Sequence, residues 1–459
     1  MIDNYILKVP MLIESEISLL KSSNVKTRKM KRLTILIITV LSLSTVVAQD
    51  ELSLSDAIRL GLENNYDLQL QRNTEEIASI NNTWGNTSIM PSIDFSLNGR
   101  ENLNYNKIEN YRTQTITPDL SLNWVIFNGF AARINKQRFE ELEAQSQGNT
   151  AVLVESSMQD IILAYNSCLL QQKMVDVYEE LANLSEDRYN RSVDSKNLGV
   201  STSYEVLQAK TSMLQDKSNY LQQKVTFENA VRTLNYTLAV ENNTQWIFST
   251  ELKAITPEYN LESLNEKLLA NNATLKNQYL YQSLMAKETA LAKSAYSPTL
   301  SLNTGIGMTD LGNYYAGSTA NTTMNHSDAY IGLTLKWSIF NGGVRKRSVA
   351  ISKINEESTQ VQTDQMKHLL NNQLLQMYSS YEVRKAVLSL ANEQEASAKL
   401  NLYLSAEKLK NGSINSFNYR DVQISYMNAA IAKYSAIYNV IQSNTDLLRI
   451  TGGIVSEFE

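Results

Sequence analysis

Strict alternation of apolar and polar residues marks four short segments of the chain. In the first of them, Ile93, Phe95 and Leu97 alternate with small polar residues. A period of two places one set of side chains on each face of a β-strand. The pattern therefore predicts two pairs of antiparallel strands, each with one apolar face. The expected strands span residues 93–105, 115–126, 299–309 and 329–339.

Long stretches that lack proline flank each pair of strands. Met158, Ile161 and Tyr165 illustrate the three- and four-residue spacing of apolar positions that is typical of helices packed as in a coiled coil. Pro91 and Pro298 mark the end of the first helix in each half, because proline disfavours helix in the residue before it. The sequence thus predicts a mainly α fold with a small antiparallel β part. The expected helices span 55–89, 129–197, 203–238, 261–295, 343–410 and 415–450.

One motif occurs twice in the chain. The pattern Leu-x-Leu-x-Trp-x-Ile-Phe-Asn-Gly begins at Leu120 and again at Leu333. Repeats of this kind indicate a repeated structural unit. The second copy has six additional residues before the motif, in a segment rich in Gly, Asn and Tyr that resembles a longer loop. We predict a duplicated helix-strand-strand-helix-helix unit, with repeats at 49–240 and 261–452, a linker at 241–260 and a tail at 453–459.

The composition excludes several classes of protein. Only 16 Gly and 5 Pro occur among 459 residues, which argues against β-propellers, sandwiches and glycine-rich nucleotide-binding folds. Two His and one Cys leave few ligands for a metal or haem site. Cys168 falls on an apolar stripe, where a buried packing role is expected. We therefore expect no enzyme activity, no cofactor and no metal site.

Residues 1–48 have the features of an export signal. A basic segment at 26–32 precedes an apolar segment at 33–47, and small residues precede Gln49. This arrangement predicts a secretory signal peptide behind an N-terminal extension, with Met30 as the expected true start. A membrane anchor is the alternative. The rest of the chain is acidic, which argues against nucleic-acid binding, and it contains no apolar run of about 18 residues.

Four strands with one apolar face are too few to close a barrel. An open sheet edge in lipid would leave peptide groups without hydrogen bonds, so several copies must share one barrel if the chain enters a membrane. Aromatic residues at the strand ends would then form a girdle at the membrane interface. The alternative is the core of a soluble helix–sheet protein. The girdle residues are Trp124, Phe127, Trp337 and Phe340.

The order of elements and the two Trp-x-Ile-Phe-Asn-Gly junctions resemble the TolC-type outer membrane efflux protein family over residues 52–452. The resemblance implies a homotrimer whose twelve-stranded outer-membrane β-barrel continues as a periplasmic α-helical barrel. It also implies a passive duct for efflux or type I secretion, which works with a periplasmic adaptor (membrane fusion) protein and an inner-membrane transporter. The resemblance does not identify the exported substrate.

In that family the helix tips close the tunnel, and acids after each tip glycine line the constriction. By resemblance, Asp421 and Glu205 would line the pore, with Asn418 and Gln208 at the related positions. Asn418 stands where the family commonly has a second acid. The alternative for both acids is a solvated residue in the first turn of a helix. The tip residues expected to contact the adaptor are Leu198, Gly199, Val200, Asn411, Gly412 and Ser413.

Two other classes of function are alternatives to the duct. A secreted or periplasmic coiled-coil scaffold or adhesin would use the same helices without a pore. Recovery in the soluble periplasmic fraction, instead of the outer membrane, would distinguish it. A periplasmic enzyme is disfavoured because the sequence has no convergent group of His, Cys or paired acids.

Overall fold

The computed structural model describes residues 50–105, 110–316 and 321–458, so the expected signal peptide lies outside the described residues. The chain divides into two units. One contains residues 1–51 and 245–247, and the other contains 52–244 and 248–459. Two short strands, β1 (Asp50–Leu52) and β4 (Trp246–Phe248), pair with each other.

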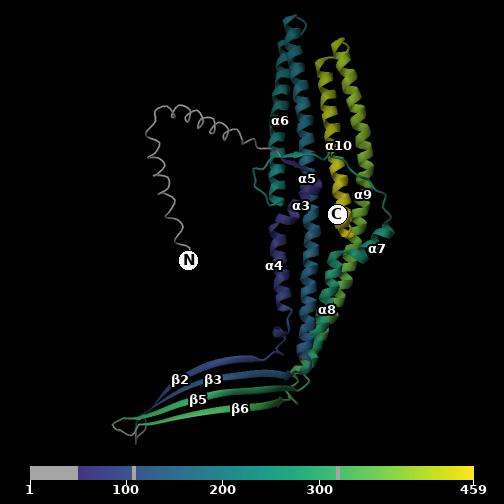
Figure 1. The fold of residues 1–459 in the computed structure, drawn as a ribbon. Coiled ribbons are helices and arrows are strands. Elements are labelled where there is room, and N and C mark those ends of the chain that lie inside the picture. The colour runs from purple at the N-terminus through teal and green to yellow at the C-terminus, as the bar shows by residue number, and fades with distance from the viewer. Residues whose placement is uncertain (1–49, 106–109, 317–320, 459) are drawn as a thin grey trace, which may run out of the picture. The chain divides into compact units, whose positions relative to one another are not determined.

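The same order of helices and strands occurs twice in the larger unit (Figure 1). The first series is α3 (Leu54–Asn64), α4 (Tyr66–Asn81), the 3₁₀ helix η1 (Trp84–Thr87), β2 (Ser92–Asn104), β3 (Tyr111–Phe127), α5 (Ala131–Asn197) and α6 (Ser203–Thr237). The second is α7 (Leu261–Asn271), α8 (Ala273–Ser294), β5 (Thr299–Tyr315), β6 (Thr322–Lys336), α9 (Val344–Lys410) and α10 (Ser416–Ile450), followed by α11 (Ile454–Phe458). The predicted class, mainly α with a small antiparallel sheet, is confirmed.

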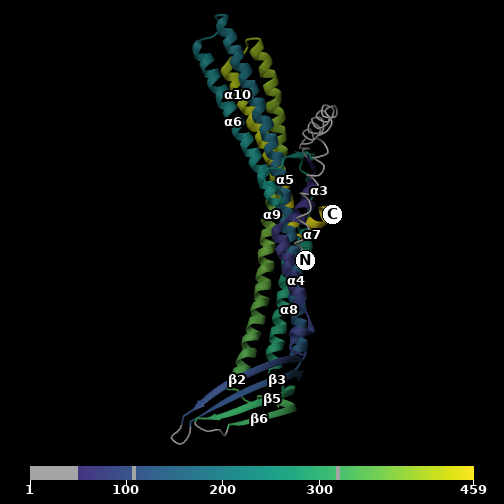
Figure 2. The same cartoon turned by 60° about the vertical axis from the view of Figure 1, so that its left-hand side comes forward.

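The four long strands form one antiparallel sheet in the order β2-β3-β5-β6 (Figure 2). Leu120 pairs with Phe95 on one side and with Ile306 on the other, so the alternating apolar residues share one face. Phe95 is 70% exposed, and the same face of β6 exposes Ile331 to 79%. The apolar face is therefore uncovered in the single chain, and β2 and β6 form the two edges of the sheet.

The strands differ in length from those expected. β5 continues to Tyr315 and β6 begins at Thr322, whereas the sequence predicted strands at 299–309 and 329–339. The predicted longer loop is mostly strand, because the β5–β6 ladder extends out to Asn313 and Thr322. The polar residues of this outer part do not alternate with apolar ones, so the sequence pattern did not indicate a strand there. β6 also ends earlier than predicted, at Lys336.

Two predicted helices are broken at an Asn-Asn pair. The expected helix 55–89 divides into α3 and α4 at Asn65 and ends at Asn81, and the expected helix 261–295 divides into α7 and α8 at Asn272. Both residues have non-helical backbone angles, with ψ of 123° and 118°. Each side chain accepts a hydrogen bond from the backbone N–H three residues later, which caps a new helix.

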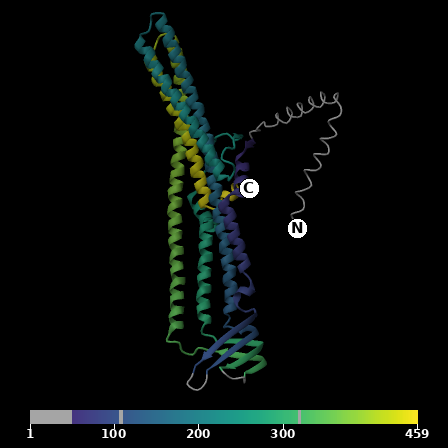
Figure 3. The ribbon, with the colours of Figure 1, turned by 90° about the vertical axis from the view of Figure 1, so that its left-hand side faces the viewer.

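The two longest helices organise the packing. α5 packs against α3, α4, α6, α8 and α10, while α9 packs mainly against α8 and α10 (Figure 3). α6 and the α3–α4 pair follow one another along α5 (Figure 1). α5 and α9 have 67 residues each, and their bounds lie within two residues of those expected.

Buried residues of α5 form the central core. Ile161 and Tyr165 are fully buried, and the Tyr165 hydroxyl donates a hydrogen bond to the Leu52 carbonyl oxygen at 2.8 Å. Cys168 is also fully buried, as expected, and burial raises the pKa of its thiol to about 12. This thiol is therefore a packing group. No helix in the described part of the chain combines the length and apolar character that crossing a bilayer requires.

Candidate functional site

The two helix tips have the same backbone design. Gly199 and Gly412 have positive φ, at +76° and +69°, and reverse the chain between the long helix and its partner. The Val200 N–H donates to the Ser195 carbonyl at 2.9 Å, and the Ser413 N–H donates to the Lys408 carbonyl at 2.8 Å. These bonds satisfy carbonyl groups at the helix ends, as in a Schellman motif.

The side chains of the two tips differ in polarity. Leu198 and Val200 flank the first tip glycine and are 80% and 82% exposed. Asn411 and Ser413 flank the second glycine and are also exposed. The α5–α6 tip thus offers an apolar surface, whereas the α9–α10 tip offers hydrogen-bonding groups.

Glu205 lies in the first turn of α6 and forms a capping box with Thr202. Its carboxylate accepts a hydrogen bond from the Ser201 hydroxyl and another from the Thr202 backbone N–H at 3.1 Å. The Ser201 bond is the main cause, and the Thr202 bond the second, of the lowered pKa of Glu205. The carboxylate is therefore bound locally, which agrees with the first-turn alternative for this residue.

Asp421 and Asn418 lie on an exposed stripe of α10. Ser425 and Asn428 continue this stripe toward the C-terminus of the helix, so the stripe is polar. Gln208 is exposed on α6, one turn after Glu205. Asp421 and Glu205 thus belong to different helical hairpins, and Asp421 is the more exposed residue.

A buried ion pair connects the two hairpins, and the sequence analysis missed it. Both guanidinium Nη atoms of Arg420 on α10 donate to Asp216 on α6, at 2.6 and 2.7 Å. The Ser185 hydroxyl on α5 also donates to Asp216. Ala209, Met213 and Asp216 share the buried face of α6. A charged residue at a core position of this helix was the sequence signal that could have revealed the pair.

The four predicted girdle aromatics lie where the strands join the helices. The indole N–H of Trp124 donates to the Ile89 carbonyl at 2.8 Å, and that of Trp337 donates to the Tyr296 carbonyl at 3.1 Å. The same bond thus forms in both halves of the chain. Phe127 packs edge to face on Phe130 at 5.3 Å, whereas Phe340 is 85% exposed.

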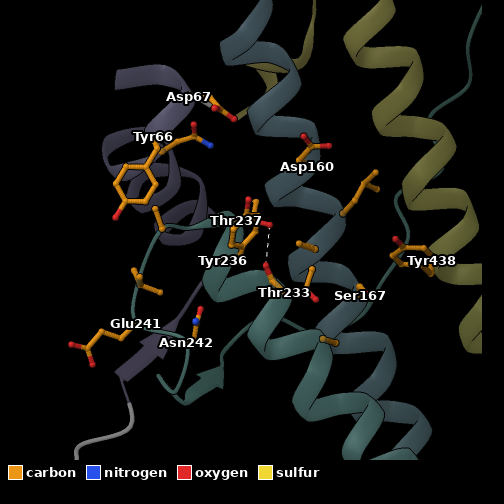
Figure 4. Close-up of a pocket in the computed structure, with 16 residues that line it drawn as sticks. Tyr66, Asp67, Asp160, Ser167, Thr233, Tyr236, Thr237, Glu241, Asn242 and Tyr438 are labelled. Atoms are coloured by element: carbon orange, nitrogen blue, oxygen red, sulfur yellow. Dashed lines mark hydrogen bonds between the residues drawn. The ribbon is translucent and has the colours of Figure 1, made fainter. Parts of the chain in front are cut away.

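A pocket of about 900 Å³ lies where the end of α6 meets the start of α4 beside α5 (Figure 4). Asp67, Asp160 and Glu241 contribute carboxylates to its wall, and Tyr66 and Tyr236 contribute aromatic rings. The lining contains no histidine, cysteine, lysine or arginine among the residues that the structure describes. Over the described ranges, no three acid, His or Cys side chains are grouped so as to hold a metal ion.

Long paired helices, an open sheet with one uncovered apolar face and helix tips that reverse at glycine are the main features of the fold. Residues 264–453 match the family model described as outer membrane efflux protein. The resemblance to the TolC-type outer membrane efflux protein family is therefore confirmed. No curated protein matches the sequence.

Solved structures of outer-membrane channels have the same fold. The channel OprN is 15% identical, with a TM-score of 0.72 over 87% of this chain and 90% of its own. CmeC from Campylobacter jejuni is 18% identical, with a TM-score of 0.70 over 87% of this chain and 85% of its own. MtrE from Neisseria gonorrhoeae is 14% identical, with a TM-score of 0.67 over 87% of this chain and 89% of its own.

Proposed function

We propose that this protein is the outer-membrane channel of a tripartite efflux or type I secretion system. Three copies form a passive duct that begins in the periplasm and opens at the cell exterior. A periplasmic adaptor contacts the helix tips, and an inner-membrane transporter drives export. The match to the outer membrane efflux protein family supports this proposal.

The main support is a set of contacts that the first half makes and the second half lacks. β3 pairs with β5, and α5 packs on α8 and α10. If the two halves are copies of one unit, β6 should pair with a β2 strand, and α9 should pack on an α4 and an α6 helix. Among the described residues of this chain, β6 pairs only with β5. A neighbouring copy would supply the missing partners.

The surfaces that would meet in this contact are apolar. Leu207, Leu214 and Leu221 on α6 follow a seven-residue spacing, and each is more than half exposed. On α9, Val383 and Leu390 are 63% and 66% exposed. Burying a leucine side chain stabilises a protein by about 1.5 to 3 kcal/mol. Packing of α9 on the α6 of the next copy covers both surfaces.

The strands support the same arrangement of copies in a closed ring. Pairing of β6 with the β2 strand of the next copy satisfies the peptide groups of both open edges, and three copies provide twelve strands. The apolar face then contacts outer-membrane lipid, and Trp124, Phe127, Trp337 and Phe340 lie at the membrane interface. The polar stripe of α10 with Asn418 and Asp421 faces the lumen, and Glu205 and Gln208 lie near the constriction.

Conductance measurements in planar bilayers test the duct. The purified protein should form channels, and Asp421→Ala should reduce cation selectivity or block by divalent cations, because rings of carboxylates attract cations. Asp187→Ala, which removes an exposed acid of α5, is the matched control and should leave both properties unchanged. Unchanged selectivity in Asp421→Ala would remove this residue from the constriction, and absence of conductance by correctly assembled protein would contradict the duct.

A further inference from the structure

Arg188 on α5 is a buried arginine with unused hydrogen-bond donors. Arg188 is 5% exposed, and its Nη1 donates to the Ser416 carbonyl oxygen at 3.4 Å. Within the described part of the chain, its Nε and Nη2 atoms have no hydrogen-bond partner. These two groups lie on one edge of the planar guanidinium, so their N–H bonds form a fork that suits a single acceptor.

The neighbouring carboxylate is already occupied. Asp216 accepts from Arg420 through both of its oxygens and also accepts from Ser185. Arg420, whose side chain is 16% exposed, therefore occupies both oxygens of this carboxylate, and the buried charge of Arg188 has no ion-pair partner among the described residues. Burial lowers the pKa of Arg188, the nearby Arg420 lowers it further, and Asp216 opposes both effects. Arginine nevertheless stays protonated in proteins, so the charge has to be compensated.

The other acids in this part of α5 are engaged elsewhere. Glu186 pairs with Lys217 at 3.3 Å, and Glu180 accepts a hydrogen bond from the Tyr426 hydroxyl at 3.0 Å. Asp187 is exposed on the surface of α5. Because Arg188 is 95% shielded within one chain, a side chain from another protein has little access to the fork. The missing acceptor has to be small.

We propose that the Arg188 fork binds a small inorganic monoanion of the chloride type between α5 and α10. The anion accepts from Nε and Nη2 and balances the charge that Asp216 leaves uncompensated. Through the bond from Arg188 to Ser416, it also fixes the start of α10 against α5. The site is structural, and the proposal does not depend on the duct.

Diffraction with bromide as the probe tests the site directly. Crystals of the full-length protein grown in bromide instead of chloride should give an anomalous peak within hydrogen-bond distance of Nε and Nη2 of Arg188. A water molecule at this position without an anomalous peak would overturn the proposal. An Arg188 side chain turned onto Asp216, with no ion present, would overturn it as well.

A second measurement uses the purified full-length protein in detergent. Its unfolding midpoint should be higher in sodium chloride than in sodium gluconate at equal ionic strength. Arg188→Gln should abolish this difference, whereas Arg191→Gln, which removes an exposed arginine one turn away, should retain it. Equal midpoints for the unchanged protein in the two salts, or an equal difference in Arg188→Gln, would contradict the proposal.

Discussion

At the scale of single residues, buried polar groups connect the two hairpins near their tips. The bidentate pair between Arg420 and Asp216 joins α10 to α6, and the Tyr426 hydroxyl joins α10 to Glu180 on α5. A buried pair of this kind adds little stability over apolar packing, but removal of one partner leaves an unpaired buried charge. We therefore expect the pair to fix how the two hairpins align.

Substitution of Asp216 tests this role. We expect Asp216→Ala to lower the free energy of unfolding by about 3 to 5 kcal/mol, because Arg420 would lose the carboxylate that both of its Nη atoms contact. Glu186→Ala, which breaks the exposed pair with Lys217, should cost less than about 1 kcal/mol. Denaturant unfolding of the purified variants measures both changes. Equal effects of the two substitutions would show that the buried pair has no special role.

Glu155 predicts a dependence of stability on pH. Burial raises the pKa of this carboxyl from 4.5 to about 7, although Arg449 and Lys276 oppose the shift. The folded protein thus holds this proton more tightly than the unfolded chain does. The contribution of Glu155 to stability is complete below about pH 4.5 and is lost as the pH rises to about 7.

Glu155→Gln removes this titration. The unfolding midpoint of the variant should fall less between pH 5 and pH 8 than that of the unchanged protein. Thermal unfolding followed by circular dichroism over this range measures the difference. Identical pH profiles for the two proteins would contradict the assignment.

At the scale of elements, paired asparagines decide where two helices break. Asn272 is 5% exposed, accepts from the Leu275 N–H at 2.8 Å and donates to the Ile450 carbonyl at 2.9 Å. Asn65 makes the equivalent cap to Leu68 but is less buried. The cap in the second half thus also holds the end of α10.

The two asparagines form a matched pair for substitution. We expect Asn65→Ala to cost about 1 kcal/mol through the lost cap. Asn272→Ala should cost about 1 to 3 kcal/mol more, because the buried Ile450 carbonyl loses its donor. Denaturant unfolding compares the two variants. A smaller loss for Asn272→Ala than for Asn65→Ala would contradict the additional role.

The sequence predicted the elements better than their interruptions. Alternation located the strands, and the lack of proline located the 67-residue helices. The breaks at Asn65 and Asn272 were missed because asparagine disfavours a helix interior by less than about 1 kcal/mol, too little to predict a break by itself. Only the caps and the tertiary contacts show that the helices break there. The ends of β5 and β6 were misplaced because their outer residues are polar on both faces.

Prediction of the candidate site was limited in a similar way. The tip glycines could be found because a reversal between helices favours a residue with positive φ. Asp421 was found only through the family resemblance, since an exposed acid on a helix has no distinctive pattern. The pairing of Asp216 with Arg420 depends on contact between distant segments, which the periodicity of one helix does not reveal.

At the scale of the whole molecule, the two junction glycines differ in the space around them. A Cβ atom added at Gly129 would lie 2.6 Å from the Ser294 carbonyl oxygen, because the first junction packs on the end of α8. At Gly342, the equivalent position, the same atom would meet nothing within 4 Å in the described chain. In the proposed trimer, we expect the first half of the next copy to occupy this space.

The mass of the assembled protein tests the central claim most directly. Native mass spectrometry of the full-length protein, released from a detergent micelle, counts the copies in each particle. The account predicts three, because three chains supply the twelve strands of the proposed barrel. A folded single chain that remains monodisperse without detergent would contradict it.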